Sequence, residues 1–308
     1  MAASLKSEDV LSQGILTLFV YIDCGSHALK MENIMNWVLP SVGCIGFLLN
    51  LVIIIKFIKK AQRKRKKLDF MIVNLALADI CFCLGIVAAF TLKLSKLDIS
   101  EKYLLIYWNI SQGLSFTASL LHIILISVDR LIGVVYPLLY KSGYITSFQL
   151  KMVLAALWLT SCFIASTQFW LELIVIDIIV SALIFIAFLT VTVIYIIIAK
   201  SIFKNAEELT EIVNQHEILA RRKVHGICTC FLLAISFFAC NIPFVISNVY
   251  YDIEGKEWSF QMAYVNFFLL TINCTLDPIF YYLRPTLAKW LKNLLLIIKP
   301  KRARVSSV

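Results

Sequence analysis

The residues of this sequence that could do chemistry are polar groups inside long apolar stretches. A carboxylate, amide or guanidinium in such a stretch raises the free energy unless it is paired or functional. The stretches carry these groups in turn: Asn50, Asn74, Asp79, Ser119, Asp129, Arg130, Trp158, Asn241, Asn273 and Asp277. Their positions make them the candidate functional residues.

No combination of residues in the sequence supports catalysis. It has no nucleophile with a neighbouring base, no phosphate-binding loop and no HExxH motif. All of the nine cysteines except Cys24 fall inside apolar stretches, where a thiol behaves as a small hydrophobe, and the four histidines are scattered. We therefore expect neither an enzyme nor a cofactor protein.

The composition excludes a water-soluble globule. Of the 308 residues 60% are hydrophobic and only 16% are charged, which leaves too little polar surface to face water. A net charge of +10 usually suggests nucleic acid, but the basic residues lie in short runs between apolar stretches. We therefore expect the lipid bilayer as a partner and no nucleic acid.

Seven stretches are long enough to cross a membrane, since about 30 Å of hydrocarbon takes roughly 20 apolar residues in a helix. They are 35–58, 70–92, 103–136, 149–170, 173–203, 219–250 and 258–283. The fourth and fifth nearly merge, and Glu172 and Asp177 predict a break there. The predicted fold is an all-α membrane protein with a seven-transmembrane helix bundle.

The basic residues predict the orientation. They are concentrated in the first loop, from Lys56 to Lys67, and in the tail after Arg284, whereas the N-terminal segment is net acidic. The positive-inside rule then places the N-terminal segment 1–34 outside the cell and the tail 284–308 in the cytoplasm, with the bundle at 35–283.

The tail has two further features. Pro285 can open a helix with apolar residues opposite Lys289 and Lys292, which predicts a short amphipathic helix on the inner leaflet. The final Ser306-Ser307-Val308 has the form of a PDZ-domain ligand, although a match of three residues is more often chance.

The order of the polar residues resembles the rhodopsin-like G-protein-coupled receptors from about 35 to 295. The matching signatures are Asn50, the Leu75-Ala76-Leu77-Ala78-Asp79 run, Asp129-Arg130 followed by Pro137, Trp158, Pro243 and the Asp277-Pro278-Ile279-Phe280-Tyr281 motif. The resemblance implies a plasma-membrane receptor that responds to an extracellular ligand and activates a heterotrimeric G protein. A channel or transporter is less consistent, because the spans do not form mirrored halves.

The resemblance also implies roles for individual residues. Asp129 and Arg130 would form the switch at the inner face, joined on activation by Tyr195 and Tyr281. The alternatives are a snorkelling arginine and ordinary interfacial tyrosines. The helix hinges would be at Phe237, Pro243 and Pro278.

A second implied site is a polar cluster at mid-membrane depth that holds a sodium ion at rest. Its residues would be Asp79, Ser119, Asn273 and Asp277, with Asp79 as the sodium ligand. Two carboxylates facing each other in a low dielectric need a cation or a shared proton, so a proton-sharing pair without sodium is the alternative.

The sequence departs from the family in ways that bear on activation. The outer end of the third stretch has no cysteine for the usual extracellular disulfide, Ala187 stands where proline is usual, and Asn241 replaces a tryptophan. Lys223 replaces the acid that often holds Arg130 at rest. These features resemble the melanocortin, cannabinoid and lysolipid branch, although the acids that bind melanocortin ligands are missing. They also raise the alternative of a signalling-silent scavenger or a constitutively active orphan receptor.

The inferred ligand-pocket lining is aromatic and neutral, with a few hydrogen-bonding groups. It comprises Gln112, Phe116, Thr117, Asn241, Asn248, Tyr264, Phe267 and Thr271. Gln112 stands where amine receptors have an aspartate, and Thr271 where opsins have the Schiff-base lysine. The lining suits a neutral or lipid-like ligand, with a peptide as a further option, and helix packing is the alternative role for each residue.

Overall fold

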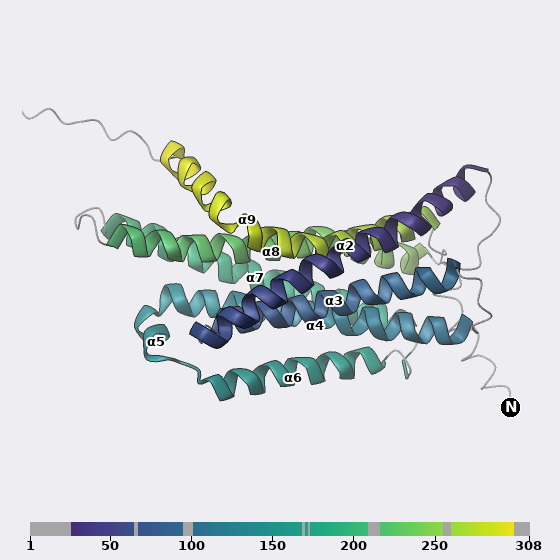
Figure 1. Cartoon of the computed structure of the whole chain (residues 1–308), viewed down its shortest axis with the longest axis horizontal. Helices are drawn as coiled ribbons and strands as arrows, with labels where there is room; N and C mark the ends of the chain where they lie inside the picture. The colour runs from purple at the N-terminus through teal and green to yellow at the C-terminus, as the bar shows by residue number, and fades with distance from the viewer. Residues whose placement is uncertain are drawn as a thin grey trace, which may run out of the picture.

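A computed structural model gives the fold as a bundle of long helices (Figure 1). It describes residues 26–64, 67–94, 101–167, 170–171, 173–208, 216–254 and 260–298, and side chains over a smaller part of these ranges. The helices are α2 (Ser26–Lys64), α3 (Lys67–Leu94), α4 (Glu101–Val135), α5 (Pro137–Ser142), α6 (Ser147–Ser166), α7 (Leu173–Glu208), α8 (His216–Glu254) and α9 (Phe260–Ile298).

The seven long helices correspond to the seven predicted stretches. The break predicted between the fourth and fifth stretches is confirmed, because α6 ends at Ser166 and α7 begins at Leu173. The fifth and sixth of these helices extend beyond the predicted stretches, since α7 continues to Glu208 and α8 begins at His216. The short α5 between α4 and α6 was not predicted.

Six of the described helices are long and apolar enough to cross a membrane: α2, α3, α4, α6, α7 and α8. The described side chains of α9 include Asn266, Asn273 and Asp277, and α9 is not among the six. A seventh crossing therefore stays a prediction. α9 runs unbroken past Pro285, and its last turns point away from the bundle (Figure 1). The apolar and basic faces predicted there, and the last residues of the tail, lie outside the described side chains.

Helix α4 lies at the centre of the bundle and packs against α3, α6, α7 and α8. One interhelical link is polar: the indole Nε1 of Trp158 on α6 donates a 3.1 Å hydrogen bond to Oδ1 of Asn74 on α3. The Trp158 ring also meets His122 of α4 edge to face, with 5.8 Å between ring centroids. Asn74 and the family signature Trp158 thus link α3, α4 and α6.

Helix α2 closes the bundle by packing on α3 and α9. Gly46 allows this approach, because a Cβ atom there would lie 2.8 Å from Sγ of Cys83 and 2.9 Å from Cγ2 of Thr275. One turn further along, Asn50 donates hydrogen bonds to the carbonyl oxygens of Gly46, at 3.0 Å, and Cys274, at 2.8 Å. Close backbone contact at small residues is typical of helix packing in membranes.

Candidate functional site

The Asp129–Arg130 pair lies at the C-terminal end of α4 and forms the predicted ion pair. Asp129 is buried, and the Arg130 side chain is 14% exposed. A buried carboxylate requires compensation by charge and hydrogen bonds. Arg130 supplies the charge, and two residues that the sequence did not indicate, Tyr140 and Tyr144, supply hydroxyl groups.

The two tyrosines contact the pair from the segment that follows α4. The Tyr144 hydroxyl donates to Oδ1 of Asp129 at 2.7 Å. The Tyr140 hydroxyl accepts from an Arg130 guanidinium nitrogen at 3.0 Å and donates to Oδ2 of Asp129 at 3.5 Å. We call Tyr140 and Tyr144 the tyrosine clamp, since together they contact both members of the ion pair.

The local sequence explains how the clamp is positioned. Pro137 opens α5 at a position where its missing N–H would have no partner. Gly143 ends the helix with φ of 84°, a left-handed conformation that favours glycine. The chain then turns back so that the rings of Tyr140 and Tyr144 stack, with 5.8 Å between centroids. Lys67 at the start of α3 places its ammonium 4.8 Å from the centre of the Tyr144 ring.

Burial raises the pKa of both clamp tyrosines above the ordinary value, and the negative charge of Asp129 raises the pKa of Tyr144 further. Both hydroxyls therefore stay protonated at physiological pH and can act as donors. If either hydroxyl lost its proton, the resulting negative charge would repel the Asp129 carboxylate and could not donate a hydrogen bond to it.

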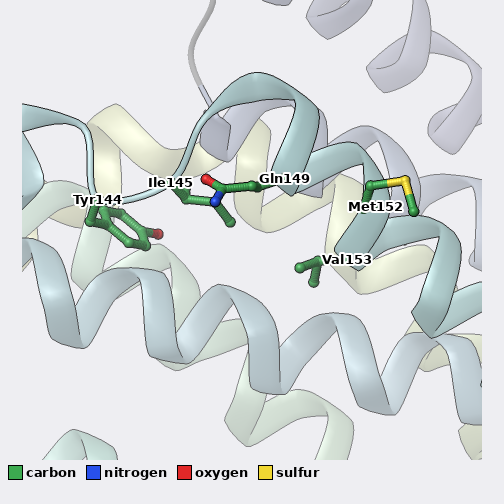
Figure 2. Close-up of a pocket in the computed structure, with 5 residues that line it drawn as sticks. All are labelled: Tyr144, Ile145, Gln149, Met152 and Val153. Atoms are coloured by element: carbon green, nitrogen blue, oxygen red, sulfur yellow. The ribbon is translucent and has the colours of Figure 1, made fainter.

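A shallow cavity of about 420 Å³ adjoins the clamp (Figure 2). Its lining consists of Tyr144, Ile145, Gln149, Met152 and Val153. Gln149 completes a capping box with Thr146, which fixes the start of α6 beside the cavity. One face of Tyr144 is thus accessible from this cavity while its hydroxyl is bonded to Asp129.

The two other predicted switch tyrosines have aromatic neighbours on different helices. Tyr195 of α7 packs against Phe231 of α8, with 5.0 Å between ring centroids. Tyr281 of α9 packs against Phe57 of α2 at 5.9 Å. Both side chains are buried. Their movement toward Arg130 on activation stays a prediction.

The four residues of the predicted polar cluster are all buried. Ser119 of α4 donates to Oδ1 of Asp79 on α3 at 3.3 Å, and the carboxyl groups of Asp79 and Asp277 are close enough to influence each other electrostatically. Asp79 Oδ2, Asp277 Oδ1 and Asn273 Oδ1 have no hydrogen-bond partner among the described residues. These are hard oxygen ligands of the kind that a small cation takes, and the carboxyl pair could instead share a proton.

The two prolines of the predicted hinges lie inside α8 and α9. Pro243 removes the hydrogen bond to the carbonyl of Ala239, and Pro278 removes the one to Cys274. At Cys274 the loss is compensated, because Asn50 donates to that carbonyl from α2. Phe237, beside the first hinge, is buried and stacks on Phe116 with 5.8 Å between ring centroids.

The predicted pocket residues fall into different packing groups. Phe116 packs with Phe237 in the core between α4 and α8, whereas Tyr264 and Phe267 pack with residues of α2 and α3. The Tyr264 hydroxyl donates to Asn36 at 3.1 Å.

Other polar groups of this set point into their own helices. The hydroxyls of Thr117 and Thr271 donate to Gly113 and Phe267. The side-chain amide of Gln112 and Oδ1 of Asn241 have no described partner. The side chains of Asn248 and of Lys223 lie outside the described residues. A ligand site here stays a prediction.

Comparison with known proteins finds a matching family model. Residues 49–174 match the model of the seven-transmembrane receptor (rhodopsin) family. This match confirms the resemblance predicted from the sequence over these residues, and six of the described helices are long and apolar enough to cross a membrane. The narrower resemblance to the melanocortin, cannabinoid and lysolipid branch stays a prediction.

Three relatives give the extent of the similarity. The chain is similar to the trissin receptor of Drosophila melanogaster, with 28% identity over 131 residues, which cover 42% of this chain and 19% of the relative. It is similar to the proto-oncogene Mas proteins of Homo sapiens, with 24% identity over 145 residues, and Mus musculus, with 25% over 138. These matches cover 46% and 44% of this chain, and 44% and 42% of the relatives. The chain thus spans less than half of the length of the curated relatives it matches.

Proposed function

We propose that the protein is a ligand-activated receptor that promotes nucleotide exchange on a heterotrimeric G protein. The observation that carries the proposal is the Asp129–Arg130 pair, which among the described residues is held by hydroxyl groups of α5 and of the turn after it rather than by a second buried charge. A guanidinium held in this way can be released by a small movement of α5. Extended, it would reach into a cavity between α4, α7 and α8.

The surface next to the pair supports a protein partner. Tyr136, Leu138 and Leu139 are 57%, 81% and 51% exposed, and they lie outside the stretches long enough to cross a membrane. Exposed apolar side chains gathered in one place mark interaction sites. We assign this surface to the G protein.

The proposed topology has seven crossings, with the N-terminus outside the cell and the C-terminus in the cytoplasm. The contact between Lys67 and Tyr144 supports it, because it places the basic first loop at the same end of the bundle as Arg130. The proposed ligand is neutral or lipid-like and binds near Gln112 and Asn241, whose amide groups have unpaired atoms in the described structure. A sodium ion at Asp79 belongs to the same proposal.

The test is a panel of nucleotide-exchange assays on G proteins of each subtype, using membranes that contain the receptor without added ligand. We expect exchange above that of untransfected membranes, because Lys223 cannot hold Arg130 by charge and no outer disulfide restrains α4. Removal of such contacts shifts a two-state balance by about 1–2 kcal/mol. No exchange with any subtype, with or without ligand, at verified surface expression, favours a scavenger receptor.

A further inference from the structure

Ser247 of α8 and Asn266 of α9 form a polar link between two helices. Nδ2 of Asn266 donates a 3.1 Å hydrogen bond to Oγ of Ser247, and this hydroxyl donates in turn to the carbonyl oxygen of Pro243 at 2.8 Å. The two residues are only 2% and 0% exposed. Since a serine hydroxyl has a single proton, the direction of this chain of bonds is fixed. A side chain of α9 is thus connected to the backbone of α8 at its proline.

The link fixes the Asn266 amide in one place. Oδ1 of Asn266 has no hydrogen-bond partner among the described residues, so the bond from Nδ2 to Ser247 is the one that this part of the chain provides. A buried polar group that loses its partner raises the free energy. Separation of Ser247 from Asn266 would leave the whole amide unpaired, so the link favours one arrangement of α8 against α9.

The bend of α8 at Pro243 is held on both sides of the proline. On one side, Nδ2 of Asn241 donates to the carbonyl oxygen of Phe237 at 2.6 Å. On the other side, Ser247 bonds the carbonyl oxygen of Pro243 itself. Bonds from a side chain to the carbonyl one turn earlier accompany bends in helices. We therefore expect α8 to move about Pro243 as one bent rod.

The other arm of this rod reaches the ion pair. Helix α8 begins at the end of the bundle that carries α5 (Figure 1). There Cys230 of α8 belongs to the same buried core as Ile126 of α4, one turn before Arg130. At 1.5 Å per residue Cys230 is about 20 Å from Pro243, whereas Ser247 is about 6 Å from it on the other side. A displacement of Ser247 from α9 thus corresponds to one about three times as large beside Arg130.

We infer that Ser247 and Asn266 are positioning residues that hold α8 in the orientation in which the Asp129–Arg130 pair is closed. The inference rests on the proposed function, in which Arg130 extends into a cavity between α4, α7 and α8. Helix α8 must tilt to open that cavity, and the tilt moves Ser247 away from Asn266. The link therefore stabilises the resting state from a place where it does not touch the ion pair.

The first test measures the hydrogen exchange of backbone amides by mass spectrometry. It uses the full chain in detergent, without ligand or G protein. Asn266→Ala removes the link but leaves the bond from Ser247 to Pro243, and it should speed the exchange of the α8 amides at 244–251 about threefold or more. Asn266→Leu, which keeps the branching at Cγ, takes its place if Asn266→Ala does not fold.

Two further variants separate the link from the local bond of the serine. Ser247→Thr keeps the hydroxyl group and should exchange like the wild type. Ser41→Ala is the matched control for Ser247→Ala, because the Ser41 hydroxyl also bonds the carbonyl one turn earlier, that of Trp37 at 2.7 Å, but is exposed on α2. Ser247→Ala should speed the exchange of the α8 amides, and Ser41→Ala should not.

The second test measures ligand-free nucleotide exchange. Asn266→Ala and Ser247→Ala should each raise it about threefold to tenfold, because an interhelical hydrogen bond of the resting state is lost. The double variant should rise no further than the single ones, since all three lack the same link. A residue with a structural role alone would instead lower nucleotide exchange together with the amount of folded receptor.

The two readouts keep the inference apart from the proposed function. Hydrogen exchange of Asn266→Ala equal to that of the wild type overturns the inference. A receptor that promotes nucleotide exchange equally with and without the link overturns it too. If the wild type and all variants are silent in nucleotide exchange while hydrogen exchange rises in both link variants, the hold on α8 is supported and the proposed function is contradicted.

Discussion

The Tyr144 hydroxyl donates a 2.7 Å hydrogen bond to the carboxylate of Asp129, the residue that pairs with Arg130. In this chain a loop tyrosine thus contacts the ion pair that the family resemblance marks as the switch. A hydrogen bond to a charged group contributes about 1.5–3 kcal/mol, and 1.4 kcal/mol is a tenfold change in an equilibrium. The clamp can therefore decide how often Arg130 is released.

The first prediction concerns that hydrogen bond. Tyr144→Phe keeps the ring and its contact with Lys67 but removes the donor, so it should raise ligand-free nucleotide exchange about tenfold or more, in keeping with about 1.5–3 kcal/mol. The control is Tyr250→Phe, since Tyr250 of α8 is 51% exposed and lies outside both the clamp and the surface assigned to the G protein. Equal exchange by both variants, at equal surface expression, would show that the clamp does not restrain the switch.

The second prediction concerns pH. The pKa values of Tyr140 and Tyr144 are raised by burial, so folding favours their protonated form. Their contribution is complete below the ordinary tyrosine pKa of about 10 and is lost only as the pH rises through the higher value. The ratio of exchange rates between Tyr144→Phe and the wild type should therefore stay constant from about pH 6 to pH 8.5. A ratio that falls toward one in this range would mean that a group other than Tyr140 and Tyr144 titrates and controls the effect of the clamp.

The third prediction distinguishes sodium from a shared proton at Asp79 and Asp277. If a cation binds, replacing sodium by N-methylglucamine at constant ionic strength should raise ligand-free exchange, and Asp79→Asn should abolish the difference. Ser119→Ala, which removes one neutral oxygen, should reduce it only in part. A wild-type protein that responds to pH but not to sodium supports the proton-sharing pair.

The fourth prediction concerns Arg130 itself. Lysine keeps the charge but loses the planar guanidinium group, whose Nη2 bonds both Asp129 and Tyr140. As a switch, the Arg130→Lys variant should lose most nucleotide exchange while surface expression and ligand affinity are kept. Normal exchange from this variant would leave the arginine as a snorkelling residue and contradict the mechanism.

The apolar runs of the sequence were sufficient to predict the seven long helices and the break near Glu172, because a bilayer demands helices of a minimum length. They could not predict the clamp. Tyr140 and Tyr144 reach Asp129 only because α5 forms and the chain reverses at Gly143. A helix this short and a single turn leave no periodic pattern of hydrophobic residues from which they could be predicted.

The predicted residues of the ligand pocket show a second limit of prediction from the sequence. Lipid and core are both apolar, so the sequence of an apolar helix says little about which face points inward. Tyr264 was expected beside a ligand with Phe116, but its ring packs with Phe90 of α3 and its hydroxyl bonds Asn36 of α2. Polar residues such as Asp79 and Ser119 were placed correctly because burial leaves them few alternatives.

The last prediction concerns Asn50 and Pro278. Pro278 has no N–H to offer the carbonyl of Cys274, and the Asn50 side chain donates to that carbonyl from α2 at 2.8 Å. Asn50→Leu keeps the branching at Cγ but leaves the buried carbonyl unpaired, which costs about 1–3 kcal/mol and should lower the unfolding temperature by several degrees.

A double-mutant cycle tests the cause of that loss. Pro278→Ala restores a backbone N–H that can reach the same carbonyl, so Asn50→Leu should cost clearly less in the Pro278→Ala protein than in the wild type. The measurement is thermal unfolding of the purified receptor in one detergent for all four proteins. Equal costs in both backgrounds would mean that Asn50 stabilises the bundle through its bond to Gly46 or through packing, and not by replacing the hydrogen bond that proline removes.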